Sequence, residues 1–191
     1  MPLRTSLAAA LLALAPTAAV PATAPAAEAE AAWSFACPAP GTAATYAPPV
    51  TMRHEGTAGG PLLCRVAGQR TPWVLGLAGD EDPSGRALLE TLERGFFPAR
   101  PGAVARRPPR PGGTGNAGAT ELTFAGYEAL EVPAGRFEAA RIDFRYQRSA
   151  DRVQTMRAWI DRATGVLVRM ELEEGPNGRR IEAVATTLTR P

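Results

Sequence analysis

The sequence contains no lysine and only one histidine, and both shortages limit the kinds of site that it can build. All 21 basic residues are arginine, which together with abundant alanine is typical of a GC-rich, bacterial genome. A zinc site is not expected, because His54 has no cluster of further nitrogen or sulfur ligands near it. The formal charge of +2 is small, and no basic stripe is interleaved with stacking aromatics. We therefore expect no cofactor and no nucleic-acid partner.

Serine is also scarce, which bears on hydrolytic chemistry. After residue 31 the chain has only Ser34, Ser84 and Ser149, and none lies in a G-x-S-x-G nucleophile elbow. His54 has a charged neighbour on each side, so we expect it on the exposed face of a strand rather than in a catalytic triad. A hydrolase that uses His54 and an acid is kept as one alternative.

The apolar run at residues 6–15 is too short to span a bilayer, which takes about 20 residues. It follows a basic N-terminus and precedes a small-residue stretch with A-x-A sites at 27–29 and 29–31, as in a cleaved secretory signal peptide. Residues 1–31 are therefore predicted to be the signal peptide and its cleavage region. We expect residues 32–191 to form a single β-rich domain without a membrane segment, in the periplasm or otherwise exported.

Cysteine occurs only at positions 37 and 64. In an exported chain, an isolated pair is most simply one disulfide bond, here between Cys37 and Cys64. Neither cysteine has C-x-x-C spacing, so metal binding explains the pair less well.

Turn and helix patterns organise residues 33–118. Residues 33–49 are rich in proline, alanine and glycine and are expected to wind over the surface. Strands are predicted at 50–56, 62–66 and 71–77. The acidic stretch D-E-D-P-S at 80–84 is a typical helix start, and apolar residues then recur every four positions, so one amphipathic helix is predicted over 84–94. Residues 99–118 are dominated by Pro, Gly and Arg and are predicted to be a flexible, exposed loop.

From residue 121 onward, apolar and polar residues alternate. Ile142 and Phe144 alternate with Arg141 and Asp143, for example, although Trp159 breaks the polar side of its own segment. A period of two predicts strands that bury one face. The fold class is therefore predicted to be mainly β (α+β), with about five C-terminal strands in an antiparallel meander and one packed helix.

The segment YEALEVPAGRFEAARI at 127–142 predicts a hairpin whose turn lies at V-P-A-G-R. Pro133 presets the first turn position and Gly135 can take a positive φ, while neither can transfer a proton or bind a metal. The turn is therefore predicted to be scaffold.

This hairpin, followed by RAWIDRATGVLVRMEL at 157–172, resembles the V-P-A-G-x-F and W-x-D/P-x-x-G hairpins of uncharacterised bacterial envelope proteins. Arg162 stands where those proteins more often have proline. FFPARPG at 96–102 and FACPAPGTAATY at 35–46 resemble further segments of the same proteins. They are similar in turn to the lipoprotein carrier LolA and receptor LolB, so the resemblance implies a half-barrel-like curved sheet around a helix.

Two groups of oxygen-bearing side chains were considered as sites. Asp80, Asp82 and Ser84 match the start of an EF-hand-type calcium loop, but Thr91 stands where the final glutamate belongs. An acidic helix cap explains the same residues, so no metal is predicted. A glycosidase needs two carboxyl groups across one cleft. The acids that could supply them are Glu128, Glu131, Glu171, Glu173 and Glu174. Acids flanked by arginines are, however, common on exposed strand faces.

A sheet that curves around one helix can leave an apolar groove that accepts an acyl chain. The same side chains could instead form a closed core, and both interpretations stay open. The sequence favours an exported, non-catalytic envelope protein that binds a lipid or other apolar ligand. The alternative is a structural or interaction partner of another envelope protein. The speculative groove residues are Leu88, Leu92, Ile142, Phe144, Met156, Trp159 and Met170.

Overall fold

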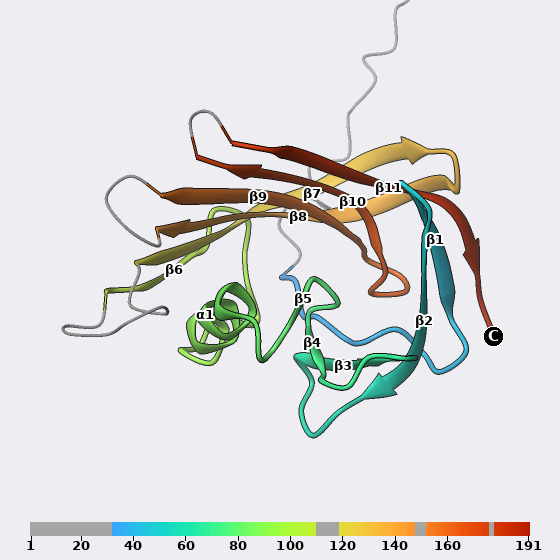
Figure 1. Cartoon of the computed structure of the whole chain (residues 1–191), viewed down its shortest axis with the longest axis horizontal. Helices are drawn as coiled ribbons and strands as arrows, with labels where there is room; N and C mark the ends of the chain where they lie inside the picture. Colours follow the sequence, from blue (N-terminus) through green and yellow to red (C-terminus); the bar gives the residue numbers. More distant parts are fainter. Residues whose placement is uncertain (1–31, 110–118, 148–151, 176–177) are drawn as a thin grey trace, which may run out of the picture.

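The computed structural model of the chain describes residues 32–109, 119–147, 152–175 and 178–191. The predicted signal peptide and Ser149 lie outside the described residues. The described residues form one antiparallel sheet of eleven strands and one helix (Figure 1). In chain order the elements are β1 (Ala43–Ala47), β2 (Val50–Thr57), β3 (Leu63–Val66), β4 (Trp73–Val74), β5 (Ala78–Gly79), α1 (Pro83–Leu92), β6 (Val104–Arg107), β7 (Thr120–Val132), β8 (Gly135–Gln147), β9 (Val153–Asp161), β10 (Leu167–Glu174) and β11 (Arg180–Thr189).

The strands lie in the order β5-β4-β3-β2-β1-β11-β10-β9-β8-β7-β6, so β5 and β6 are the edges of an unclosed sheet. Strands β7 to β11 confirm the predicted antiparallel meander, and β2 and β3 confirm the first predicted pair. The third predicted strand is much shorter than expected. It ends at Val74 because Leu75 and Gly76 take positive φ values of 52° and 69°, which break the extended backbone.

The prediction that residues 33–49 wind over the surface is wrong. Strand β1 pairs with both β2 and β11 inside the sheet, and Ala44 and Tyr46 point into the core. Trp33 is also buried, and its backbone exchanges hydrogen bonds of 2.6 and 2.8 Å with Ala99. Its ring centroid lies 5.0 Å from that of Phe97. Buried side chains therefore hold this segment against the core, although its proline, alanine and glycine content indicated a loop.

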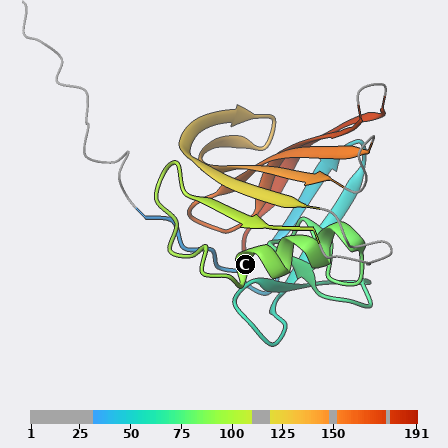
Figure 2. The same cartoon turned by 90° about the vertical axis from the view of Figure 1, so that its left-hand side faces the viewer.

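Helix α1 confirms the predicted amphipathic helix. Asp82 is the N-cap, and its carboxylate accepts hydrogen bonds from the backbone N–H groups of Ser84 and Gly85 at 2.8 and 3.4 Å. Pro83 suits the first turn, whose N–H groups have no partner within the helix. The helix contacts β4 and β5 near one edge of the sheet and β6 and β7 at the other edge, as Figure 2 shows.

Strand β6 corrects the prediction of an exposed loop over residues 99–118, of which 110–118 lie outside the described residues. Arg107, on this strand, is only 1% exposed. Its Nη2 donates to Thr120 Oγ1 at 3.3 Å, and its Nε lies 3.6 Å from Glu90 Oε2 on α1. The guanidinium therefore joins the edge strand to the helix, a tertiary role that a Pro/Gly/Arg-rich composition does not reveal.

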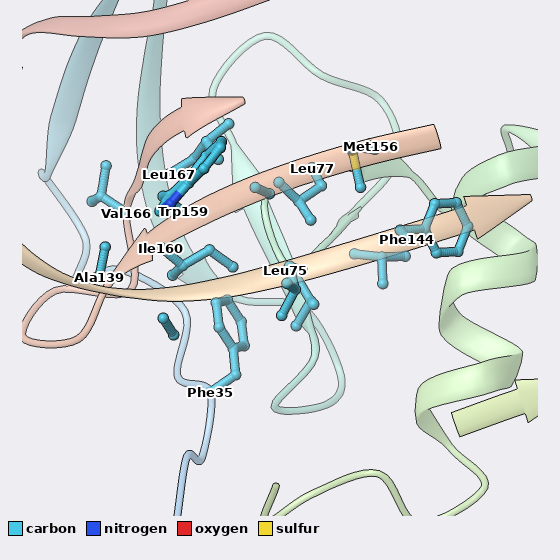
Figure 3. Close-up of a cluster of buried hydrophobic side chains, with 14 of the residues drawn as sticks. Phe35, Leu75, Leu77, Ala139, Phe144, Met156, Trp159, Ile160, Val166 and Leu167 are labelled. Carbon is cyan, nitrogen blue, oxygen red and sulfur yellow. The ribbon is translucent and has the colours of Figure 1, made fainter. Parts of the chain in front are cut away.

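One core cluster lies between α1 and the sheet. It includes Leu88 and Leu92 from the helix and Ile142, Phe144 and Met156 from β8 and β9. Figure 3 shows part of this cluster, in which Leu75 and Leu77 lie among side chains of β8 and β9 such as Phe144 and Met156.

Candidate functional site

The seven predicted groove residues are enclosed rather than arranged along an open groove. Six of them, on α1, β8 and β9, are at most 8% exposed and belong to the same core cluster. Met170 is partly buried against that cluster. Trp159 lies on the opposite face of the sheet, because it pairs directly with Arg141 and Arg169. Six of the seven therefore pack between the sheet and the helix, while Trp159 belongs to the same buried cluster from the opposite face of the sheet.

His54 was expected on an exposed strand face, and this is wrong. It lies on β2 with its side chain toward the core and is 2% exposed. Neither ring nitrogen has a hydrogen-bond partner among the described residues. No described serine or acid therefore forms the hydrogen bonds to His54 that a catalytic triad requires. Burial lowers the pKa of the imidazole, since the charged form is poorly solvated there.

Two of the three calcium candidates, Asp82 and Ser84, are accounted for by helix capping, whereas Asp80 takes no part in the cap. The Asp82 carboxylate accepts hydrogen bonds from two backbone N–H groups of α1 and from the Ser84 hydroxyl, which is the role of a helix N-cap. Within the described ranges, no group of three or more His, Cys, Asp or Glu residues is placed to hold a metal ion.

A dense set of charged side chains lies on the face of β8 to β11 that points away from the core. Residues directly opposite each other on paired strands share a face, so the strand register orders these side chains into three rows. The first row is Arg141, Trp159, Arg169 and Val184. The second is Asp143, Arg157, Glu171 and Glu182. The third is Arg145, Thr155, Glu173 and Arg180. We call these three rows the charged face.

Glu171 is the centre of the charged face. Its Oε1 lies 2.7 Å from Arg169 Nη2, and its Oε2 lies 3.6 and 3.7 Å from the guanidinium groups of Arg157 and Arg180. Arg169 also reaches Glu182 at 2.9 Å. The Glu171 side chain is only 15% exposed, so these pairs are less screened by solvent than pairs at the rim.

The hairpin formed by β7 and β8 curls over one end of the charged face (Figure 2). Its turn reaches across two strands, because the Ala134 N–H donates to the Ala185 carbonyl of β11 at 3.1 Å. Glu128 accepts from the Trp159 indole N–H at 2.9 Å and from Arg141 Nη1 at 2.5 Å. The turn therefore contributes backbone contacts, as the scaffold interpretation predicts, while Glu128 locks the indole in place.

The open end of the charged face is hollowed. A cavity of about 520 Å³, which we call the face hollow, lies over the second and third rows. Its acids are Glu121, Asp143, Glu171 and Glu173, and its arginines are Arg145, Arg157 and Arg180. Thr123 and Thr155 add hydroxyl groups, and Phe144, Met156 and Leu172 complete the lining. The hollow can therefore offer a polar ligand both cationic hydrogen-bond donors and anionic acceptors.

Two further observations bear on class and location. The predicted disulfide is confirmed, with Cys37 and Cys64 joined and their Cα atoms 5.4 Å apart. In the part of the chain that the structure describes, the single helix has neither the length nor the apolar character to cross a membrane. Comparisons with protein-family models, with curated proteins and with solved structures each found no match for this chain.

Sequence reasoning did not single out the arginines of the charged face as a set. The alternation within each strand was visible, but the register between strands, which decides what Glu171 or Trp159 contacts, depends on bulges. One lies between Phe124 and Gly126 and another between Leu167 and Arg169. Gly126, a glycine inside a strand pattern, is a local sign of the first bulge, whereas no local pattern marked the second.

Proposed function

We propose that this chain is an exported, non-catalytic binding module of the bacterial envelope, and that it binds its partner through the charged face. The N-terminal sequence supports export, and the disulfide is compatible with it. The same proposal includes a relationship to the LolA and LolB half-barrels, with which an open sheet packed on one helix is compatible.

The observation that carries the proposal is the contrast between the two faces of the sheet. Toward the helix, the residues expected to line an apolar groove fill the core themselves. On the other side, the face hollow is lined mostly by charged groups. Binding sites are concave and present a few well-placed polar groups to their ligands, so the face hollow fits this role better.

Charge patterning also indicates the chemistry of the partner. The face hollow has four carboxylates and three guanidiniums, and acyl chains offer nothing to satisfy them. A polar partner that carries charges of its own is favoured over a lipid. We therefore place the apolar-ligand hypothesis behind an interaction role.

The test compares the two partner classes directly. The immobilised protein should retain a component of its own envelope extract in low salt and release it as salt rises, because rim charge contacts are screened. The double variant Arg157→Glu, Arg180→Glu should lose this retention. Both side chains are more than 60% exposed, so the fold should tolerate the change.

Arg136→Glu is the matched control, since Arg136 is an exposed arginine at the hairpin tip, outside the charged face. Its retention should equal that of the wild type. Saturable uptake of a fluorescent fatty acid, unaffected by the double variant, would contradict the proposal and restore the apolar-ligand hypothesis.

A further inference from the structure

Two oppositely charged side chains of the face hollow have no ion pair or hydrogen bond with any described residue. They are Arg145 on β8 and Glu173 on β10, and both are exposed. Arg180 lies directly across from Glu173, but its guanidinium is the one that approaches Glu171 at 3.7 Å. An unpaired cation and an unpaired anion thus remain within one cavity.

The register fixes how far apart these two side chains start. Arg145 pairs with Thr155, and Thr155 pairs with Glu173, so one strand separates them. Two strand spacings correspond to about 9.5 Å. The short Thr155 side chain lies between them and leaves a low floor with one hydroxyl group.

A buried acceptor lies next to this gap. Asp143 Oδ2 accepts from Arg141 Nη2 at 3.3 Å, while Asp143 Oδ1 is buried and has no hydrogen-bond partner among the described residues. This atom has no contact with solvent, so a ligand in the hollow does not reach it, and the groups that can meet a ligand are the exposed ones. Arg157, two residues from Thr155 on the same face, lies directly opposite Asp143 in the second row, and its guanidinium approaches Glu171.

We propose that the face hollow binds a short zwitterionic peptide. Its carboxylate contacts Arg145, and its ammonium group donates to Glu173. An extended dipeptide is about 7 Å long, which suits the gap between the two flanking side chains. A plain anion or cation would leave one of the two unpaired charges without a partner. This inference rests on the proposed function and names the ligand class for the charged face.

Isothermal titration calorimetry with glycylglycine tests the proposal. The controls are the same dipeptide blocked by N-acetylation and C-terminal amidation, together with acetate and methylammonium. We expect saturable binding of glycylglycine alone. Charge-assisted hydrogen bonds are worth roughly 1.5–3 kcal/mol, so Arg145→Gln and Glu173→Gln should each weaken binding about tenfold or more. Arg136→Gln should bind as the wild type does.

Two results would overturn the proposal. One is that no saturable heat is observed with glycylglycine, and the other is that the blocked dipeptide, acetate or methylammonium binds equally well. Wild-type affinity in both hollow variants would have the same meaning. If glycylglycine fails while the Arg157→Glu, Arg180→Glu variant still loses retention of its envelope partner, the ligand class is wrong and the proposed function stands.

Discussion

Replacing His54 with leucine should stabilise the protein. The imidazole is 2% exposed, and neither ring nitrogen has a hydrogen-bond partner among the described residues. A buried polar group without a partner costs about 1–3 kcal/mol, and an apolar side chain of similar size removes that cost. The difference in shape between histidine and leucine within a packed core should destabilise the fold by less than about 1.5 kcal/mol. We expect His54→Leu to raise the free energy of unfolding by about 1 kcal/mol or more at pH 8.

The same substitution should also remove a pH dependence. Burial lowers the pKa of His54 in the folded protein, whereas the unfolded chain has the ordinary value of about 6.5. Below pH 6.5 the unfolded state therefore binds more protons than the folded state, and the free energy of unfolding decreases as the pH is lowered. The slope is at most about 1.4 kcal/mol per pH unit down to the folded pKa. This loss should be present in the wild type and absent from His54→Leu.

Urea unfolding followed by tryptophan fluorescence at pH 8 and pH 5.5 measures both effects. His54→Gln is the matched control, because it keeps a buried polar group without a titrating one and should gain little stability while losing the pH dependence. The reasoning would be refuted if His54→Leu were less stable than the wild type by more than about 0.5 kcal/mol at pH 8, because the packing penalty can exceed the smallest desolvation gain by no more than that. That result would mean that the imidazole has hydrogen-bond partners in the native protein.

Three other substitutions test the fold. Cys37→Ser with Cys64→Ser should lower the free energy of unfolding by about 3.5 kcal/mol, because the bridge closes 27 residues; a urea midpoint equal to that of the oxidised wild type would contradict this. Arg107→Ala should cost about 3 kcal/mol or more, since a buried charge network loses its cation, and Arg107→Met should recover part of the thermal midpoint through packing; no change in either variant would show that this arginine does not join helix and sheet. Gly165→Ala should lower the thermal midpoint, because φ is +71° and the new Cβ would collide with the Ala36 carbonyl; an unchanged midpoint would argue against the close approach there.

The C-terminal half of the fold could be predicted because its strands bury one face against the helix. Ile142 and Phe144 on one side of β8, with Arg141 and Asp143 on the other, define the strand without any tertiary information. The helix was equally readable, since Asp82 and Pro83 mark its start chemically. Periodicity and capping are local, so a single sequence displays them.

The parts that were missed depend on contacts between distant segments. Strand β1 and β6 have loop-like compositions, and it is their pairing with β11 and β7 that makes them strands. His54 alternates correctly with its neighbours, but which side of β2 faces the core follows from the sheet as a whole. Trp159 does lie on the polar side, as its position in the alternation indicates, and the curled hairpin with Glu128 is what covers it.

Native mass spectrometry of the protein purified from its own envelope fraction is the most direct test of the charged face as the binding surface. We predict a co-purifying polar mass, a peptide or a protein, that is absent when the Arg157→Glu, Arg180→Glu variant is purified in the same way. A lipid that is released on denaturation and binds this variant as well as the wild type would contradict the account.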